Sequence, residues 1–394
     1  MAGRFYANRA VFDAAWIDTQ SDLLRALRDS GVEIVLDSNV AELCARGRFD
    51  GAPRRLPWAK EGRPLAAEDL SRGAIDRIAE FAVAREVDVV LAPTHFLLDA
   101  GDEALRVDLR LCPELRAALD RAGGRRIAID YPLLTTYSAL RDSVQRRAFM
   151  ARLQGLPFDN LWLRISGFGA DASAVKVRRY IAALLDLISA GKPIVADRVG
   201  GLAGLAVVSF GASGAIAHGV GERERFDASD WNRPRRVGGG GQNGRLYLPA
   251  IDRLLPMKDA QVLMDAKGAR RILSCHDSEC CPRGADDMMR DPKAHFLKQR
   301  AKQLQEISSI PEQRRADRFL LEHLAAADRS ARQAAKIQPG DEHLSRALKS
   351  ASIRLDKLRM VLDDLYRTLG DEGPRSAAPA HRAKMGGAAL SGLG

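Results

Sequence analysis

The sequence predicts an α/β fold, a (β/α)8 barrel of the TIM type with a C-terminal zinc-binding helical extension. Short β-branched runs alternate with helix-sized amphipathic segments between about residues 30 and 277. Several of these runs are almost continuously apolar, which is typical of parallel strands buried on both faces. Beyond them, three of the five cysteines fall within seven consecutive positions. A doubly wound parallel sheet is the alternative that the same alternation allows.

Eight apolar runs are the candidate strands of the barrel. They span residues 32–37, 87–92, 126–130, 160–165, 193–197, 205–209, 245–249 and 271–275. The segments between them are mostly long enough for helices. Residues 65–84 and 174–190, for example, place apolar side chains at steps of three and four, as an amphipathic helix does.

The chain beyond the last candidate strand is predicted to be helical. Asp291-Pro292 is typical of an N-cap followed by proline at the first helical position, which predicts a helix to about residue 307. A further helix is expected over 344–369, and the residues from about 370 onward have the composition of a disordered segment. We therefore expect a catalytic-type barrel at 1–274, a zinc-binding and basic helical extension at 275–370, and a disordered tail at 371–394.

The composition indicates a soluble, cytoplasmic protein. Of the 394 residues, 46% are hydrophobic and 28% are charged, and no apolar run approaches the ~20 residues that cross a bilayer. The N-terminus has no apolar segment that resembles a secretory signal. Five cysteines argue against a disulfide framework. The net charge of +10 favours a polyanionic partner, and an arginine-rich genome explains the same excess equally well.

Four residues form the candidate metal site. They are Cys275, Cys280, Cys281 and His295, with His276 as an alternative ligand in place of Cys281. Thiolate and imidazole are the ligands that Zn²⁺ prefers, and three thiolates with one imidazole fill a tetrahedron, which predicts a structural rather than a catalytic ion. Buried free thiols beside a surface histidine are the competing interpretation.

Polar residues recur where the candidate strands end, and in a barrel of this type the chemistry lies at the carboxyl ends of the strands. These residues are Asp37, His95, Asp130, Arg164, Asp197, Arg198, His218 and Asp277. Two glycine-rich segments, at 211–222 and 233–245, are candidates for close approach of a ligand to the backbone. Basic residues surround the cysteines and predict either a phosphate-binding surface or a solvated helix face: Arg283, Arg290, Lys293, Lys298, Arg300 and Lys302.

The order of these features resembles the tRNA-guanine transglycosylase (queuine tRNA-ribosyltransferase) family, of which the chain looks like a divergent member. Val35-Leu-Asp-Ser38 is similar to that family's early strand that ends in Asp-Ser, and Gly219-Val-Gly-Glu222 is similar to its base-binding strand end. The three cysteines and the histidine are similar to its zinc site. The resemblance covers roughly residues 30 to 300, and it implies a (β/α)8 barrel that exchanges a base in tRNA.

The resemblance also implies roles for particular residues. Asp37 corresponds to the general acid/base, and the expected substrate-binding residues are Ser38, His95, Asp130, Gly219, Gly221 and Glu222. The chain departs from the family at several places, which include the cysteine spacing and the acidic base reader that Pro93-Thr-His95-Phe replaces. Asn39-Val-Ala41 stands where the family has Gly-Gly-Phe, and Ser274 stands where the family has its nucleophilic aspartate.

Base exchange at a sugar C1′ needs one carboxylate that attacks the anomeric carbon and a second that carries a proton to and from the base. We predict Asp277 as the nucleophile and Asp37 as the acid/base, with Asp130 and Asp197 as open substitutes. The competing interpretations are a helix-capping role for Asp37 and a loop role for Asp277. The predicted function is a transglycosylase-like enzyme that exchanges or acts on a nucleobase in tRNA or another nucleic acid. A catalytically inactive nucleic-acid-binding barrel and a zinc metallohydrolase are the alternatives.

Overall fold

The computed structural model describes residues 7–47, 52–70, 72–188, 191–220, 224–233 and 244–370. The predicted disordered tail, Gly221, Glu222 and most of the basic glycine-rich segment lie outside the described residues. None of the described helices is long and apolar enough to cross a bilayer.

A parallel sheet organises the first part of the chain. Its strands are β1 (Arg9–Asp13), β2 (Glu33–Asp37), β3 (Val89–Leu91), β4 (Phe96–Leu97), β5 (Ala128–Thr136), β6 (Asn160–Ser166), β8 (Ile194–Asp197) and β9 (Ala215–Ala217). Seven of them follow the order β1-β2-β3-β5-β6-β8-β9, and β4 pairs with β5. Every pairing in this sheet is parallel.

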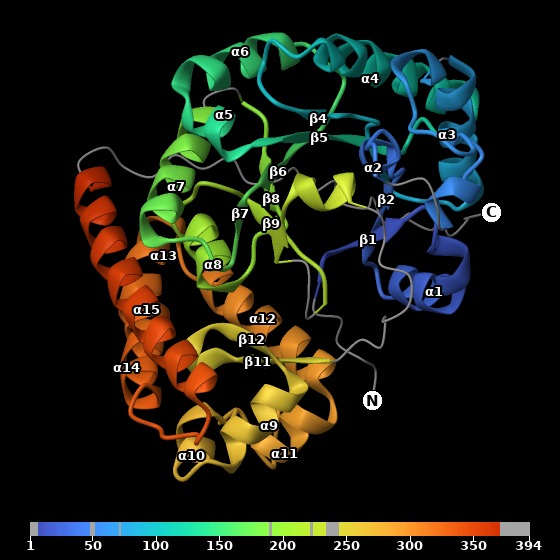
Figure 1. Ribbon diagram of the computed structural model, residues 1–394. Coiled ribbons are helices and arrows are strands. Elements are labelled where there is room, and N and C mark those ends of the chain that lie inside the picture. The colour runs from blue at the N-terminus through green and yellow to red at the C-terminus, as the bar shows by residue number, and fades with distance from the viewer. Residues whose placement is uncertain are drawn as a thin grey trace, which may run out of the picture.

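The sheet curls into a half-barrel (Figure 1). β1 and β9 lie at the two ends of the strand order, and no pairing joins them within the described residues. The predicted parallel α/β architecture is therefore confirmed, but the described strands do not close into the predicted eight-stranded barrel. Figure 1 shows α3, α4 and α6 along the outer side of the curl.

Both faces of the sheet are buried, as the apolar runs predicted. On β2, Ile34 and Leu36 pack into the main core under the helices, whereas Val35 points to the opposite face. There Val35 joins Val89, Leu91, Trp162 and Val195 in a small apolar cluster inside the curl. Side chains alternate along a strand. On β2, β6 and β8, the residue two positions after the cluster residue therefore lies on the same inner face.

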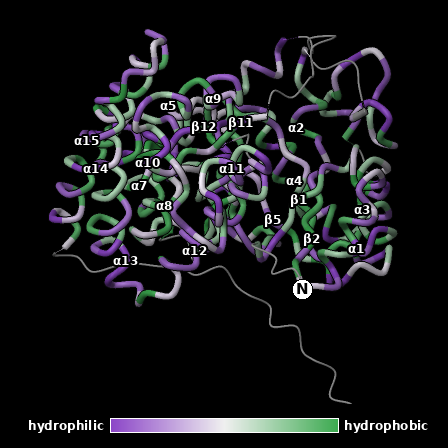
Figure 2. The backbone as a smooth tube through the Cα atoms, turned by 90° about the horizontal axis from the view of Figure 1, so that it is seen from below, coloured by the Kyte–Doolittle hydropathy of each residue, from purple (hydrophilic) through white to green (hydrophobic). Residues whose placement is uncertain are grey.

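The helices of this part follow the strands in the expected rhythm. They are α1 (Ser21–Asp29), α2 (Val40–Leu43), α3 (Arg72–Ala84), α4 (Glu103–Arg121), α5 (Tyr137–Arg141), α6 (Ser143–Leu153), α7 (Ala174–Ile188) and α8 (Gly201–Ser209). A short antiparallel pair, β7 (Phe168–Gly169) with β10 (Arg225–Phe226), extends from the sheet. Figure 2 shows how hydrophobic and hydrophilic positions alternate along these helices.

The rest of the chain is a hairpin followed by helices. The hairpin strands are β11 (Arg245–Leu248) and β12 (Arg253–Pro256), and the helices are α9 (Met257–Asp265), α10 (Ala269–Leu273), α11 (Ala285–Arg290), α12 (Pro292–Ser308), α13 (Glu312–Arg318), α14 (Ala325–Ala334) and α15 (Glu342–Leu369). A π-helical turn, Phe319–Leu324, joins α13 to α14. The helices predicted at 291–307 and 344–369 are confirmed as α12 and α15. One continuous hydrophobic core includes both Phe12 of β1 and Leu365 of α15.

Two of the eight predicted strands are wrong. Residues 205–209 belong to α8, and residues 271–275 include the end of α10. Every residue of α8 is buried, and a short run that is apolar on all sides has the same pattern in a buried strand and a buried helix. The run at 245–249 does form a strand, but it lies in the separate hairpin. The strands β1 and β9 were not predicted from the sequence, and β9 lies in the first glycine-rich segment.

Candidate functional site

The structure brings the four predicted metal ligands together. Cys275 follows α10, Cys280 and Cys281 lie in the turn before α11, and His295 lies in the first turn of α12. Their ligand atoms all lie within 4.8 Å of one another. His276 is exposed and bonds the Arg271 carbonyl, so the cluster is formed with Cys281.

The spacing of the donor atoms fits a tetrahedral ion. Bonds of about 2.3 Å to sulfur and 2.0–2.1 Å to nitrogen require tetrahedron edges of about 3.5–3.8 Å. The His295 Nδ1 lies 3.5 Å from the Cys280 Sγ and 3.4 Å from the Cys281 Sγ, and the two sulfurs lie 3.6 Å apart. All of these cysteines are free thiols rather than disulfides. The cluster can therefore hold a metal ion.

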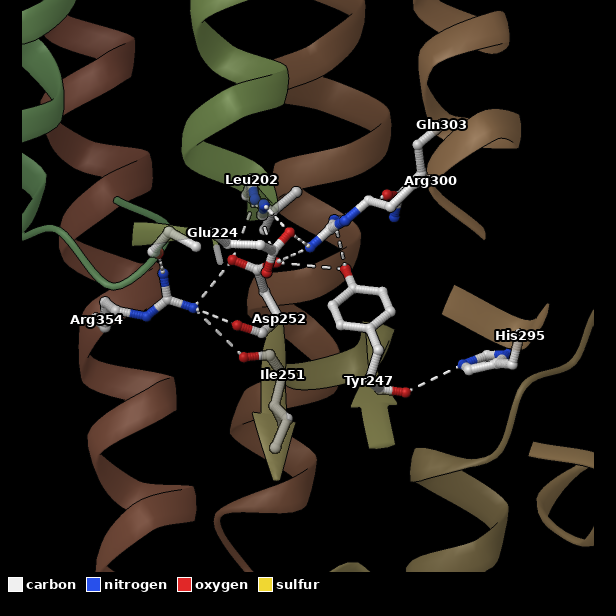
Figure 3. A network of polar contacts seen from close by, with 11 residues as sticks. Leu202, Glu224, Tyr247, Ile251, Asp252, His295, Arg300, Gln303 and Arg354 are labelled. Carbon is white, nitrogen blue, oxygen red and sulfur yellow. Dashed lines mark hydrogen bonds and ion pairs between the residues drawn. The ribbon is translucent and has the colours of Figure 1, made fainter. Parts of the chain in front are cut away.

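Neighbouring groups orient these ligands. The His295 Nε2 lies 3.0 Å from the Tyr247 carbonyl oxygen, to which it donates (Figure 3), so its Nδ1 lone pair faces the sulfurs. A metal-binding histidine commonly has a partner of this kind. Asp291 caps α12 by accepting from the Ala294 amide at 3.0 Å, which places His295 in the first turn.

Asp277 holds the cysteine turn. Its carboxylate accepts from the backbone amides of Glu279 and Cys280 at 3.0 and 3.3 Å and pairs with Lys302 at 2.8 Å. The hydrogen bond from Lys302 lowers the pKa of Asp277. Neither a hydrogen bond nor an ion pair joins Asp277 to Asp37 in the described part of the chain, so these contacts favour the loop role for Asp277.

The thiols of the cluster cannot all ionise without a cation. The hydrogen bond from Cys275 lowers the pKa of Cys280 to about 4. Burial raises the pKa of Cys281 to about 12, and the neighbouring Cys280 raises the pKa of Cys275. Without a positive charge nearby, three sulfurs packed this closely favour a single thiolate, because each further negative charge would repel the first. A divalent cation supplies that charge and stabilises the remaining thiolates.

A buried ionic network, which was not predicted from the sequence, lies beside the cysteine-histidine cluster (Figure 3). Arg300 of α12 bonds the Tyr247 hydroxyl at 2.9 Å and the Glu224 carboxylate at 3.0 Å. Arg354 of α15 pairs with Asp252 at 3.1 Å, and the same carboxylate accepts from the backbone at the start of α8. The network therefore ties the hairpin, two C-terminal helices and α8 together.

The basic residues around the cysteines mostly make internal contacts. Arg300 is buried against Glu224, and Arg283 and Arg290 both pair with Asp287. Lys302 pairs with Asp277, and Lys298 donates to the Glu279 carbonyl. Of these six basic residues, Lys293 alone is exposed and makes no hydrogen bond or ion pair to the described residues. Arg300 is therefore too buried to belong to a phosphate-binding surface, and whether the other five basic residues form one stays a prediction.

A charged layer lies at the carboxyl edge of the sheet, above the inner apolar cluster. Asp37, Arg164 and Asp197 each follow an inner-face residue by two positions, so all three point inward. The Arg164 guanidinium pairs with Asp197 at 2.6 Å and with Asp37 at 3.2 Å. The sequence predicted that these three residues lie at strand ends, and in the structure they are in contact.

Asp13 adds a second carboxylate next to Asp37. Neither Asp13 nor its strand β1 was predicted from the sequence. The two aspartates are register partners at the ends of β1 and β2. The Asn39 side chain donates to Asp13, and burial raises the pKa of Asp13. Asp37 and Ser38 also line a cavity of about 10 Å³, which has room for about one water.

The other predicted substrate-binding residues are dispersed. Asp130 lies inside the long strand β5 rather than at a strand end, because the run continues to Thr136. Its buried carboxylate accepts from Asn160 and Trp162, at 2.7 Å each, and pairs with Arg9. The backbone carbonyl of Gly219, which follows β9, bonds the His218 ring. His95 faces a different cavity, described below.

Ser274, which the resemblance placed at the position of the family nucleophile, is the C-cap of α10 rather than the end of a strand. One signal pointed to a residue that was missed: the short apolar run Ala10-Val-Phe12 is followed directly by Asp13, as in a strand that ends in a carboxylate. Neither Glu224 nor Asp252 stood in a recognisable pattern.

The fold and these sites define an α/β protein with a parallel half-barrel, a charged rim and a Cys3His cluster suited to a metal ion. No model of a known protein family matches the chain, and no curated protein matches it. Among solved structures it is similar to an endo-1,4-beta-xylanase from Penicillium canescens, with 13% sequence identity and a TM-score of 0.32. The match covers 50% of this chain and 66% of the xylanase, just under two thirds of that enzyme. A similarity this weak carries no argument about function.

Proposed function

We propose that the protein is a transglycosylase-like enzyme that acts on a nucleobase in tRNA or another nucleic acid, with zinc in a structural role. The observation that carries the proposal is the pair of carboxylates, Asp13 and Asp37, at the adjoining ends of β1 and β2. Base exchange needs two carboxyl groups on one face with different tasks. The resemblance to the tRNA-guanine transglycosylases supports the choice of substrate.

The environments of the two carboxyl groups suit different tasks. Asp13 is the proton carrier, because burial raises its pKa and favours the protonated form. Asp37 is the group that attacks C1′, and Arg164 provides it with a counter-ion at 3.2 Å. This assignment replaces Asp277 and gives Asp37 the nucleophilic role. The cavity beside Asp37 is about 10 Å³, so a base binds only after side chains at the rim move apart.

The metal site has a structural role in this proposal. Three thiolates and one imidazole complete a tetrahedron and leave no open position for water, which disfavours the metallohydrolase alternative. His295 and the network around Arg300 connect the cluster to the hairpin. A bound ion would hold α11 and α12 against that hairpin.

Base exchange provides the test. Purified protein is incubated with labelled guanine and either tRNA or duplex DNA, and incorporation is measured. We expect Asp37→Asn and Asp13→Asn each to lower the exchange rate by ~10²-fold or more, since each removes a carboxylate that acts on the reacting atoms. We expect Asp277→Asn to retain activity as long as its zinc content is unchanged.

Asp88→Asn is the matched control. Asp88 lies at the opposite edge of the same sheet, where its side chain accepts from the Ile34 amide at 2.8 Å, and asparagine preserves that acceptor. Full activity in both rim variants contradicts the proposal. Absence of exchange by the parent on both nucleic acids, with binding retained, favours the inactive nucleic-acid-binding alternative.

A further inference from the structure

A cysteine, a histidine and an aspartate lie together outside the rim and the metal site. The His95 Nδ1 lies 2.6 Å from the Asp108 Oδ1, and the His95 backbone amide donates to the other oxygen of the same carboxylate at 3.0 Å. Cys44 is a neighbour of the His95 ring, and the two residues line the same cavity. Because Nδ1 is occupied by Asp108, the nitrogen left to face Cys44 is Nε2.

The fold positions these three groups from neighbouring strand ends. Cys44 is the C-cap of α2, which follows β2, and His95 lies in the loop after β3. Asp108 belongs to the second turn of α4 and is fully buried, whereas the His95 side chain is 12% exposed. Cys44 is partly exposed. The carboxylate is therefore inside, and the thiol is nearest to solvent.

Cys44 and His95 line a cavity of about 500 Å³. Its volume lies in the range of small-molecule sites. Part of the wall is apolar, from Leu65, Ala67, Ala104 and Val107. Arg106 also lines it, and this exposed guanidinium has no hydrogen bond or ion pair to the described residues. A carboxylate is the natural partner of such a group, since arginine binds it in two parallel hydrogen bonds.

We infer that Cys44 and His95 form a second catalytic site, oriented by Asp108, that accepts an ester or thioester whose acyl group carries a carboxylate. A nucleophile in reach of a base, with the base held by a third group, is the arrangement of covalent acyl-transfer sites. Cys44 is the nucleophile, His95 the acid/base, and Asp108 a positioning residue. This site is independent of the proposed base exchange.

The reaction proceeds in two balanced steps. The Cys44 sulfur, its proton already lost to solvent, forms a bond to the acyl carbon, and the bond from that carbon to the alcohol or thiol breaks. The protonated His95 gives its Nε2 proton to the leaving group. Water then attacks the thioester with the now neutral His95 as base, which releases the carboxylic acid and restores the thiolate and the imidazolium.

The electrostatics agree with this geometry. Burial alone lowers the pKa of His95, but the hydrogen bond to Asp108 and the neighbouring Cys44 outweigh it and raise the pKa to about 10. His95 is therefore held in the protonated form that can give a proton to the leaving group. The charged or titratable groups that face His95 or line its cavity are Cys44, Glu103, Arg106 and Asp108, and Asp102 acts on Asp108.

The test uses two probes on the full chain. Iodoacetamide reports the reactivity of each thiol as a function of pH, located by peptide mass spectrometry. The mono-4-nitrophenyl ester of succinic acid reports acyl transfer, with 4-nitrophenyl acetate as the uncharged comparison. We expect alkylation of Cys44 to be faster in the parent than in His95→Gln, and we expect a succinyl group to be trapped on Cys44 during turnover.

The variants separate the roles. Cys44→Ala loses acylation. His95→Gln slows acylation by ~10²-fold and also slows the alkylation of Cys44. Asp108→Asn shifts the alkylation profile toward that of His95→Gln. Arg106→Gln raises KM for the succinate ester several-fold and leaves the acetate ester unchanged. Cys112→Ser, which alters a buried thiol of α4, is the control.

Three results would overturn the inference. One is alkylation of Cys44 with the same rate and pH profile in the parent and in His95→Gln. Another is ester hydrolysis that is unchanged in Cys44→Ala. The third is acylation located at the cysteines of the metal site instead of Cys44. The comparison of the parent with His95→Gln also decides the question if Asp108→Asn fails to fold.

Discussion

Cys280→Ser is expected to reduce bound zinc from one ion per chain to a small fraction of that. The substitution removes one of four donors whose spacing fits a tetrahedron, and the serine hydroxyl is a poor ligand for zinc. The folded state also loses the stabilisation that ligand binding provides. That loss is about 3–4 kcal/mol when free zinc exceeds its Kd by 100- to 1,000-fold. Elemental analysis and thermal unfolding, with and without a chelator, measure both effects.

Cys112→Ser is the matched control for the metal site as well. Cys112 is as buried as the cluster cysteines, but it lies in α4 and burial raises the pKa of its thiol to about 12. Its substitution should cost some stability and leave the zinc content at one ion per chain. Zinc clearly below one equivalent in the parent, or retained in Cys280→Ser, would refute the structural zinc site.

Arg300→Met is expected to destabilise the protein by about 3–5 kcal/mol, because it leaves buried carboxylates without their counter-ion. Arg300 bonds Glu224 and the Tyr247 hydroxyl, and it lies 3.8 Å from Asp252. Methionine preserves much of the side-chain volume, so the loss is mainly electrostatic. Urea unfolding monitored by circular dichroism gives the change in the free energy of unfolding.

Two further variants test this explanation. Lys298→Met changes a cation on the same helix that donates to the Glu279 carbonyl at the surface, and it should cost less than about 1 kcal/mol. Adding Glu224→Gln to Arg300→Met removes the unpaired carboxylate and should restore part of the stability. Equal losses in Arg300→Met and Lys298→Met would show that the buried network does not contribute as inferred.

Local patterns predicted much of the architecture, and their errors have identifiable causes. The β-branched runs at 32–37, 87–92, 160–165 and 193–197 are strands, because their three or four consecutive apolar residues must be covered on both faces. The run at 205–209 satisfied the same criterion as part of the buried helix α8. Composition alone cannot separate these outcomes, since complete burial removes the periodicity that distinguishes strand from helix.

The metal ligands were predictable for a different reason. Cys275, Cys280 and Cys281 lie close together in the chain, and the Asp291-Pro292 N-cap places His295 at a helix start, so most of their proximity is local. Asp13 and Asp37 are far apart in the chain and become neighbours only through the pairing of β1 with β2. Cys44, His95 and Asp108 likewise meet only when two strand ends and a helix pack together.

The sequence by itself therefore determined the alternation of strands and helices, the Cys3His set and the carboxylate at the end of β2. The tertiary structure decided that the sheet remains a half-barrel and that Asp277 supports the cysteine turn. It also decided which charges pair in the interior, such as Arg300 with Glu224. The physical reason is range: propensity, capping and ligand spacing act over a few residues, whereas strand pairing and buried ion pairs join residues that only the complete fold brings into contact.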